Sequence, residues 1–193
     1  MIKREARILG LSAHRKGRTI LVVGVVFRGS LWLDGVISCL LEMNGTNQNS
    51  TLSGTIKRSK QYSQLHAIIV KKQLALGFEL DLDDLARRVN LPVITITNRH
   101  ISKAPKKGMS QRRLQHYDII VNGHHLSVLA VRISRVGVQQ VFKVGCGPTS
   151  SIPEAVRVAN LLVQESSRCR FLWQRRKLKI GPSHTRHPRI KSV

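Results

Sequence analysis

Acidic residues are scarce in this chain. It has 33 Lys and Arg but only 10 Asp and Glu among 193 residues, which gives a formal net charge of +23. An ordinary soluble domain stays within roughly 2–8 charges of neutrality, so this excess indicates a polyanionic partner. The excess is uneven, because residues 85–193 hold 21 basic and three acidic residues, a net charge of +18.

Aromatic residues, cysteines and long apolar runs are also few. Aromatic residues make up 4% of the chain, too few for a base-stacking surface. The three cysteines are far apart, and no Cys-x-x-Cys pair occurs, which argues against a zinc ribbon or a disulfide framework. No apolar run approaches the roughly 20 residues that span a bilayer, and no signal-peptide pattern is present. We therefore expect a cytoplasmic protein with no membrane partner, and nucleic acid is the favoured polyanion.

The apolar segments alternate in a way that predicts a layered α/β domain with some parallel strand pairing. Strands are expected at residues 6–12, 19–27, 31–42, 66–70, 93–97, 118–122 and 125–133. Helices are expected at residues 50–63 and from Asp81 to Leu91, and residues 134–145 suit either state because Gly137 argues against a helix. Ser151-Ile152-Pro153-Glu154 has the pattern of a capping box and predicts a further helix through Val163, apolar nearly all round and therefore buried.

Five motifs along the chain resemble an uncharacterised, mainly archaeal family related to endonuclease V. They are Leu21–Gly29, Leu33–Val36, Gly77-Phe78, Leu91–Ile94 and Ile152–Ala159, and the resemblance covers roughly residues 6–97 and 126–165. The resemblance implies a ribonuclease-H-like, endonuclease-V-like mixed sheet flanked by helices. We assign this α/β domain to residues 1–167 and a basic C-terminal extension to residues 168–193.

The same resemblance points to a departure at the expected metal site. Nucleases of this fold hold Mg²⁺ with carboxylates at the ends of adjacent strands. The family's first strand typically ends in Gly-Ile-Asp-Asp, where this chain has Gly10-Leu11-Ser12-Ala13, and its fourth strand typically ends in Asp-Gly, where this chain has Lys71-Lys72. Serine is a poor Mg²⁺ ligand and an ammonium group repels a cation. The sequence therefore predicts no metal, no cofactor and no catalytic residue, and hence a protein that is not an enzyme.

The remaining acidic and nucleophilic residues have structural interpretations. Asp81, Asp83 and Asp84 suit a helix start, where negative charge meets the helix dipole, with a metal site as the alternative. Asp34 is expected to be structural, and Cys146 lacks an evident base.

Basic residues carry the predicted binding function. We expect phosphate contacts from Arg99, Lys103, Lys106, Lys107, Arg112 and Arg113 in the segment after Thr97, from Arg168, Arg170, Arg175, Arg176, Lys177, Lys179, Arg186, Arg189 and Lys191 in the extension, and from Lys71 and Lys72. The favoured hypothesis is a non-catalytic, ribosomal or ribosome-associated RNA-binding protein, with rRNA and neighbouring ribosomal proteins as partners. The alternatives are a metal-dependent endonuclease of the endonuclease V type with rearranged ligands and a DNA-binding chromosomal protein.

Overall fold

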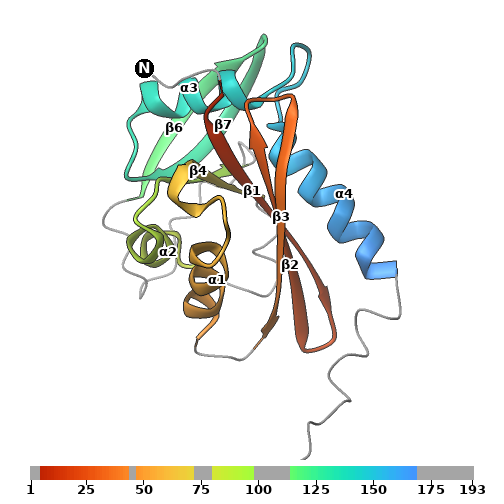
Figure 1. The fold of residues 1–193 in the computed structure, drawn as a ribbon. Helices are drawn as coiled ribbons and strands as arrows, with labels where there is room; N and C mark the ends of the chain where they lie inside the picture. The colour runs from red at the N-terminus through yellow and green to blue at the C-terminus, as the bar shows by residue number, and fades with distance from the viewer. Residues whose placement is uncertain (1–4, 44–46, 72–79, 98–113, 169–193) are drawn as a thin grey trace, which may run out of the picture.

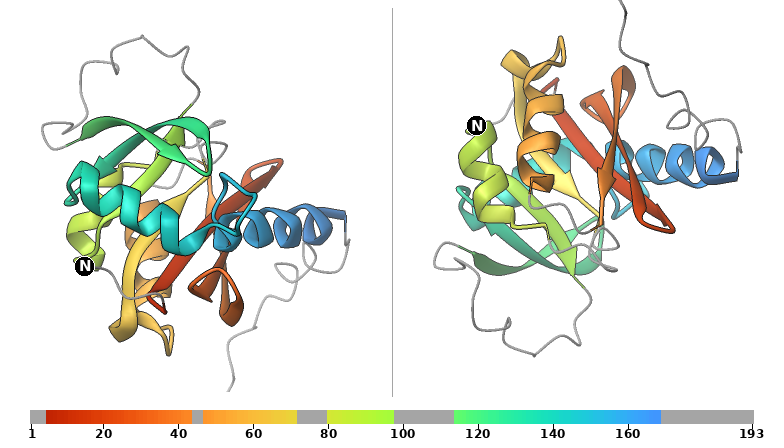
Figure 2. Two further views of the ribbon diagram at one scale, coloured as in Figure 1. Left: turned by 90° about the horizontal axis from the view of Figure 1, so that it is seen from above. Right: turned by 90° about the horizontal axis from the view of Figure 1, so that it is seen from below.

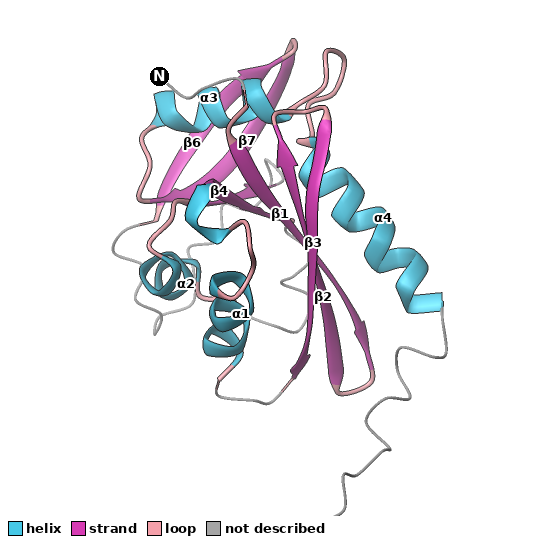
Figure 3. Ribbon diagram, in the orientation of Figure 1, coloured by secondary structure: helices cyan, strands magenta, loops and turns pink. Residues whose placement is uncertain are grey.

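A computed structural model describes residues 5–43, 47–71, 80–97 and 114–168. One seven-stranded sheet has the order β3-β2-β1-β4-β5-β7-β6. Its strands are β1 (Arg7–Lys16), β2 (Thr19–Arg28), β3 (Trp32–Glu42), β4 (Leu65–Val70), β5 (Val93–Thr97), β6 (Gln115–Val121) and β7 (His124–Val131). The described helices are α1 (Gln48–Lys57), the 3-10 turn η1 (Tyr62–Gln64), α2 (Leu82–Val89), α3 (Arg135–Gly145) and α4 (Glu154–Arg168) (Figures 1 and 3).

The sheet is mixed. β1 pairs antiparallel with β2 and parallel with β4, and β4 pairs parallel with β5. The carboxyl ends of β1, β4 and β5 therefore lie at one edge of the sheet, where ligands bind in open α/β sheets. β2 lies between β1 and β3, and its run Thr19–Arg28 is buried at every position but its two ends. This placement explains why its sequence is continuously apolar rather than alternating.

Helices cover both faces of the sheet. α1 and α2 pack on the face that carries Leu9 and Leu11 of β1, and α3 and α4 pack on the face that carries Ile8. Figure 2 shows α3 and α4 following one another across that second face, α3 over the β6 side and α4 over β1 and β2. The described core thus consists of two apolar layers, one on each side of the sheet.

The predicted α/β class and the mixed sheet flanked by helices are confirmed, and each predicted strand occurs within a few residues of its expected bounds. The ambiguous segment 134–145 is helix α3. The Ser134 hydroxyl accepts a hydrogen bond from the Gly137 backbone N–H at 3.3 Å, and Val138, Val141 and Phe142 are buried on one side of the helix. The cap and the apolar stripe together outweigh the helix penalty of Gly137, which is about 1 kcal/mol.

Helix α4 differs from its prediction. Leu161 and Leu162 are 48% and 37% exposed, so the expected burial all round is wrong. Only the stripe through Ala155, Val156, Ala159 and Val163 is buried, because the helix rests on the sheet along one side. Glu154 pairs with Arg157 rather than reaching back toward Ser151.

The basic extension after Arg168 lies outside the described residues, and the proposed division at residues 167 and 168 stays a prediction. In the part of the chain that the structure describes, no helix is both long enough and apolar enough to cross a bilayer.

Candidate functional site

Ser12 and Lys71 lie side by side where the parallel pairing of β1 with β4 ends, at the carboxyl end of β4, while β1 itself continues to Lys16. Leu11 of β1 is in register with Val70 of β4, and the Lys71 backbone N–H donates to the Leu11 carbonyl at 2.9 Å. Alternation along each strand directs Ser12 and Lys71 to the same face as Ile8 and Ile69, which is the face that α4 covers. The polar pair therefore stands at the end of an otherwise apolar row.

Gly10 brings the backbone of α4 close to this row. A Cβ atom at Gly10 would lie 2.2 Å from the Ala155 carbonyl carbon and 2.4 Å from the Val156 nitrogen. No side chain fits between strand and helix at this point, so glycine is required for the close approach. The contact anchors the start of α4 on β1 and directs the next turns of the helix toward Ser12.

Asn160 of α4 completes a polar cluster with these residues. The Lys71 ammonium donates to Asn160 Oδ1 at 2.5 Å, and the Ser12 hydroxyl donates to the same oxygen at 3.4 Å. Ser12 is 1% exposed, and Lys71 and Asn160 are half-buried. We refer to Ser12, Lys71 and Asn160 as the strand-end cluster.

Lys71 places an ammonium group in a half-buried position directly after β4. Burial lowers the pKa of its ammonium group below the ordinary value of 10.5. Within the described ranges, no carboxylate forms an ion pair with Lys71. Among these described residues, the side-chain acceptor of this positive charge is the neutral amide oxygen of Asn160.

A divalent metal ion does not fit these residues. Mg²⁺ takes oxygen ligands and usually at least one carboxylate, but the strand-end cluster has one hydroxyl, one amide and one ammonium group. The ammonium nitrogen has no lone pair to offer and repels a cation. Among the described residues, no group of three or more His, Cys, Asp or Glu side chains could hold a metal.

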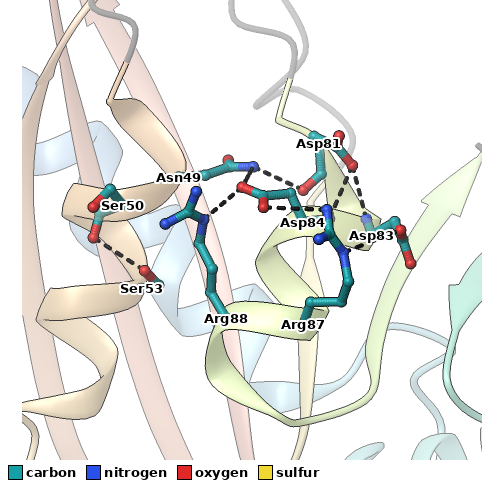
Figure 4. A network of polar contacts seen from close by, with 8 residues as sticks. All are labelled: Asn49, Ser50, Ser53, Asp81, Asp83, Asp84, Arg87 and Arg88. Atoms are coloured by element: carbon teal, nitrogen blue, oxygen red, sulfur yellow. Dashed lines mark hydrogen bonds and ion pairs between the residues drawn. The ribbon is translucent and has the colours of Figure 1, made fainter. Parts of the chain in front are cut away.

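The acidic residues at the start of α2 make structural contacts, although the buried Oδ1 of Asp83 has no hydrogen-bond partner among the described residues. Asp81 caps the helix, its side chain accepting from the backbone N–H groups of Asp83 and Asp84 at 3.0 Å. Figure 4 shows Asn49 of α1 donating to the Asp81 carbonyl and to the Asp84 carboxylate, both at 3.0 Å, while Arg88 pairs with Asp84. The helix-start interpretation of this acidic cluster is thus supported, and the cluster also ties α1 to α2.

Two further acidic side chains are held by neighbours. Asp34 of β3 forms an ion pair with Arg7 of β1, in agreement with its predicted structural role. Asp118 of β6 accepts a hydrogen bond from the Ser127 hydroxyl, which also lies 3.2 Å from His116 Nε2. Ser127 is 4% exposed and its proton is directed to Asp118, so this Ser, His and Asp group lacks the geometry of an activated nucleophile.

Cys146 is also unsuited to nucleophilic catalysis. Its side chain is buried at the end of α3, and burial raises the pKa of its thiol to about 12. Since the thiolate is the nucleophile, the group is unreactive at neutral pH.

Most of the predicted phosphate-binding residues lie outside the described residues. These are Lys72, the six residues from Arg99 to Arg113, and the extension from Arg170 to Lys191. Arg168 is the last residue of α4, and its side chain is not described. Lys71 is the member of the predicted set whose surroundings the structure defines, and its phosphate contact stays a prediction.

The sequence prediction missed Asn160, although the pattern contained a signal. Val156, Ala159, Asn160 and Val163 stand at positions i, i+3, i+4 and i+7, so a single polar residue interrupts the apolar stripe of α4. A polar residue at such a position needs a partner from another element. Which partner it finds depends on the packing of α4 against β1 and β4.

The sequence of this chain is similar to those of known proteins. A family model described as Endonuclease dU matches residues 4–166. The UPF0215 protein of Methanosarcina mazei is 27% identical over 177 residues, covering 83% of this chain and 90% of that protein.

Two solved structures show the same fold. A protein of unknown function from Archaeoglobus fulgidus has a TM-score of 0.64 at 17% identity, covering 83% of this chain and 97% of that one. Endonuclease V from Ciona intestinalis, in complex with a 24-mer DNA that contains an inosine followed by a ribo-adenosine, has a TM-score of 0.57 at 9% identity, covering 84% of this chain and 86% of that one. The predicted endonuclease-V-like fold is thereby confirmed.

These comparisons correct three predictions. The match with a nuclease family contradicts the prediction that the protein is not an enzyme. The same match contradicts the predicted rRNA and ribosomal-protein partners. The physical reason is that phosphate attraction does not depend on the kind of nucleic acid, so net charge could not select RNA. The predicted loss of the metal-ligand carboxylates stays a prediction, and it does not exclude catalysis.

Proposed function

Because this chain belongs to the endonuclease dU family, we propose that it is a nuclease that acts on a DNA strand at the strand-end cluster. The observation that carries the proposal is the family match over residues 4–166, which includes all seven strands of the sheet and most of α4. The cluster supports the location, because it lies at the carboxyl end of β4, where the pairing of β4 with β1 ends.

The family description suggests the first substrate to test. The description Endonuclease dU suggests DNA that contains deoxyuridine as the first substrate. The DNA in the Ciona intestinalis complex contains inosine, which suggests inosine-containing DNA as the second substrate. Both substrates present the same phosphate chemistry with a different base.

The cluster contributes charge and position to this reaction. Phosphoryl transfer depends mainly on placing the phosphate and stabilising the negative charge that develops on its oxygens. The Lys71 ammonium group can donate to such a phosphate oxygen. Asn160 positions this ammonium group, since Lys71 Nζ donates to Asn160 Oδ1 at 2.5 Å. Ser12 is buried, and its hydroxyl makes a long contact of 3.4 Å with the same amide oxygen.

A cleavage assay tests the proposal. Full-length protein is incubated with end-labelled duplexes that contain one deoxyuridine, one inosine or no modified base, in Mg²⁺, in Mn²⁺ and in EDTA. We expect cleavage next to the modified base and a loss of about 100-fold in rate for Lys71→Met, the scale for removal of one charge-stabilising donor.

Lys57→Met is the matched control, because Lys57 is exposed in the last turn of α1 on the opposite face of the sheet. This substitution also removes one positive charge, but at a position far from the cluster. The variant should cleave at the same rate as the unmodified chain. Absence of cleavage of every duplex under all three conditions would refute the nuclease proposal. Equal rates for Lys71→Met and Lys57→Met would refute the location.

A further inference from the structure

We propose that Lys71 supplies at this site the positive charge that a carboxylate-bound cation would otherwise supply, so that the chain binds a DNA phosphate without a divalent metal. The inference rests on the proposed function, since it concerns the same site and the same strand. It follows from three properties of the cluster as far as the structure describes its surroundings: a charge without a carboxylate partner, N–H donors on two side chains, and a rigid support.

The first property is the charge of Lys71. A half-buried ammonium group normally has a carboxylate partner, because burial disfavours the charged form. Here burial lowers the pKa of Lys71, and the described part of the chain provides Asn160 Oδ1 as its side-chain acceptor. A lysine ammonium has three N–H donors, so two remain for a ligand. The group that satisfies both the charge and the donors is an anion.

The second property is the orientation of Asn160. An ammonium group and a hydroxyl that donates both require an acceptor, so Asn160 turns Oδ1 toward Lys71 and Ser12. The amide NH₂ is consequently directed away from these two donors, and it makes no hydrogen bond within the part of the chain that the structure describes. The cluster therefore presents N–H groups from both Lys71 and Asn160. Such a set selects phosphate oxygens and rejects metal ions.

The third property is the close contact of α4 with β1. The helix backbone rests directly on Gly10, with no side chain between them. Asn160 is thus carried on a helix that is fixed against the strand carrying Ser12, and Lys71 follows the neighbouring strand. A site supported in this way needs little reorganisation when the phosphate binds.

Binding in the absence of metal is the direct test. The fluorescence anisotropy of a labelled duplex with one deoxyuridine is measured against full-length protein in EDTA and in Mg²⁺. We expect dissociation constants that agree within about twofold between the two conditions. Lys71→Met should weaken binding about tenfold in EDTA, the lower end for a hydrogen bond to a charged group. It should also reduce the slope of log affinity against log salt by about 0.9, the value for one phosphate contact.

Lys57→Met is again the control, and circular dichroism confirms that both variants are folded. Binding that disappears in EDTA would overturn the inference. So would equal affinities of Lys71→Met and Lys57→Met, because Lys71 would then make no special contact.

Asn160→Asp separates phosphate binding from a purely structural role. The new carboxylate would neutralise Lys71, so in EDTA the melting temperature should rise while the affinity for DNA falls at least as far as in Lys71→Met. Asn160 acts here as a positioning residue. If the melting temperature rises but the affinity is unchanged, the Lys71 and Asn160 contact is structural only, and the inference is wrong.

The two proposals fail in different ways. Metal-independent binding that depends on Lys71, without cleavage of any duplex, would leave this inference standing and refute the nuclease function. Cleavage of a duplex, together with DNA binding that requires Mg²⁺, would support the nuclease function and refute this inference.

Discussion

Replacement of Gly10 by alanine tests the packing on which the site depends. The Cβ atom of the variant would lie 2.2 Å from the carbonyl carbon of Ala155, and the neighbouring atoms are backbone atoms of the helix, which cannot rotate away. Ordinary van der Waals contact begins at 3.4 Å, so α4 must move away from β1 by about 1.2 Å. The same movement would carry Asn160 away from its present position and weaken its contact with Lys71, which is 2.5 Å long in the unmodified chain.

The expected destabilisation follows from this displacement. Overpacking a core costs about 1–3 kcal/mol, and the upper half of that range applies where backbone blocks the new atom. For a chain of this length each kcal/mol corresponds to about 2–4 °C in melting temperature. Gly10→Ala should therefore melt at least 4 °C lower and bind the deoxyuridine duplex more weakly, since Asn160 moves out of place.

Thermal unfolding followed by circular dichroism measures the change, with urea unfolding as a second measure of the free energy. Gly147→Ala is the matched control, because its Cβ atom would meet only the Glu154 carboxylate at 3.8 Å. Its free energy of unfolding should stay the same or rise by up to about 1 kcal/mol. A Gly10→Ala variant within 0.5 kcal/mol of the unmodified chain, on the scale of an ordinary surface substitution, would refute the close approach of α4.

Three further predictions concern residues outside the strand-end cluster. Asp81→Ala should lower the free energy of unfolding in urea by about 1 kcal/mol, because two backbone N–H groups lose their acceptor; an unchanged midpoint would contradict the cap. Burial acts to raise the pKa of Asp84, but hydrogen bonds from Arg88 and Asn49 outweigh it and hold the pKa below 3.8. The stability that the Asp84 charge contributes is therefore present above pH 3.8 and lost as the pH falls through the lowered pKa. In a pH titration of unfolding, the free energy of unfolding of Asp84→Asn should depend less on pH in that window than the free energy of the unmodified chain. Cys146, whose thiol pKa burial raises to about 12, should react with iodoacetamide only after unfolding; peptide mapping that finds it modified in the folded protein would show that the burial is wrong.

Local sequence patterns predicted most of the fold because strands and caps are short-range features. The apolar run at Thr19–Phe27 and the carboxylate at Asp81 each act within a few residues, and the structure has strand β2 and the α2 cap at those places. Helix α3 was harder to predict, because the unfavourable Gly137 and the favourable Ser134 cap oppose each other, and burial of Phe142 against the sheet decides the outcome. The exposure of Leu161 had no local signal, since it depends on which side of α4 meets β1.

The sequence also showed what stands at the candidate site, but not what those residues do. Ser12 and Lys71 were both predicted at strand ends, but β1 continues past Ser12 to Lys16, and only Lys71 directly follows the end of its strand. From the predicted loss of carboxylates we had concluded that the protein is not an enzyme. That conclusion was wrong, because the chain matches a nuclease family. It was drawn from two positions of the site, without the third residue, Asn160, that contacts both of them.

The sequence by itself determined the chemical character of this protein: a large positive charge, a mixed α/β fold, and a hydroxyl and an ammonium group at Ser12 and Lys71. The tertiary structure alone decided that Asn160, which is 148 residues from Ser12 and 89 residues from Lys71, lies between them. Contacts over such separations depend on how a whole helix docks on a sheet. Here the docking depends on Gly10, whose missing side chain leaves room for the helix backbone and thereby brings the three groups together.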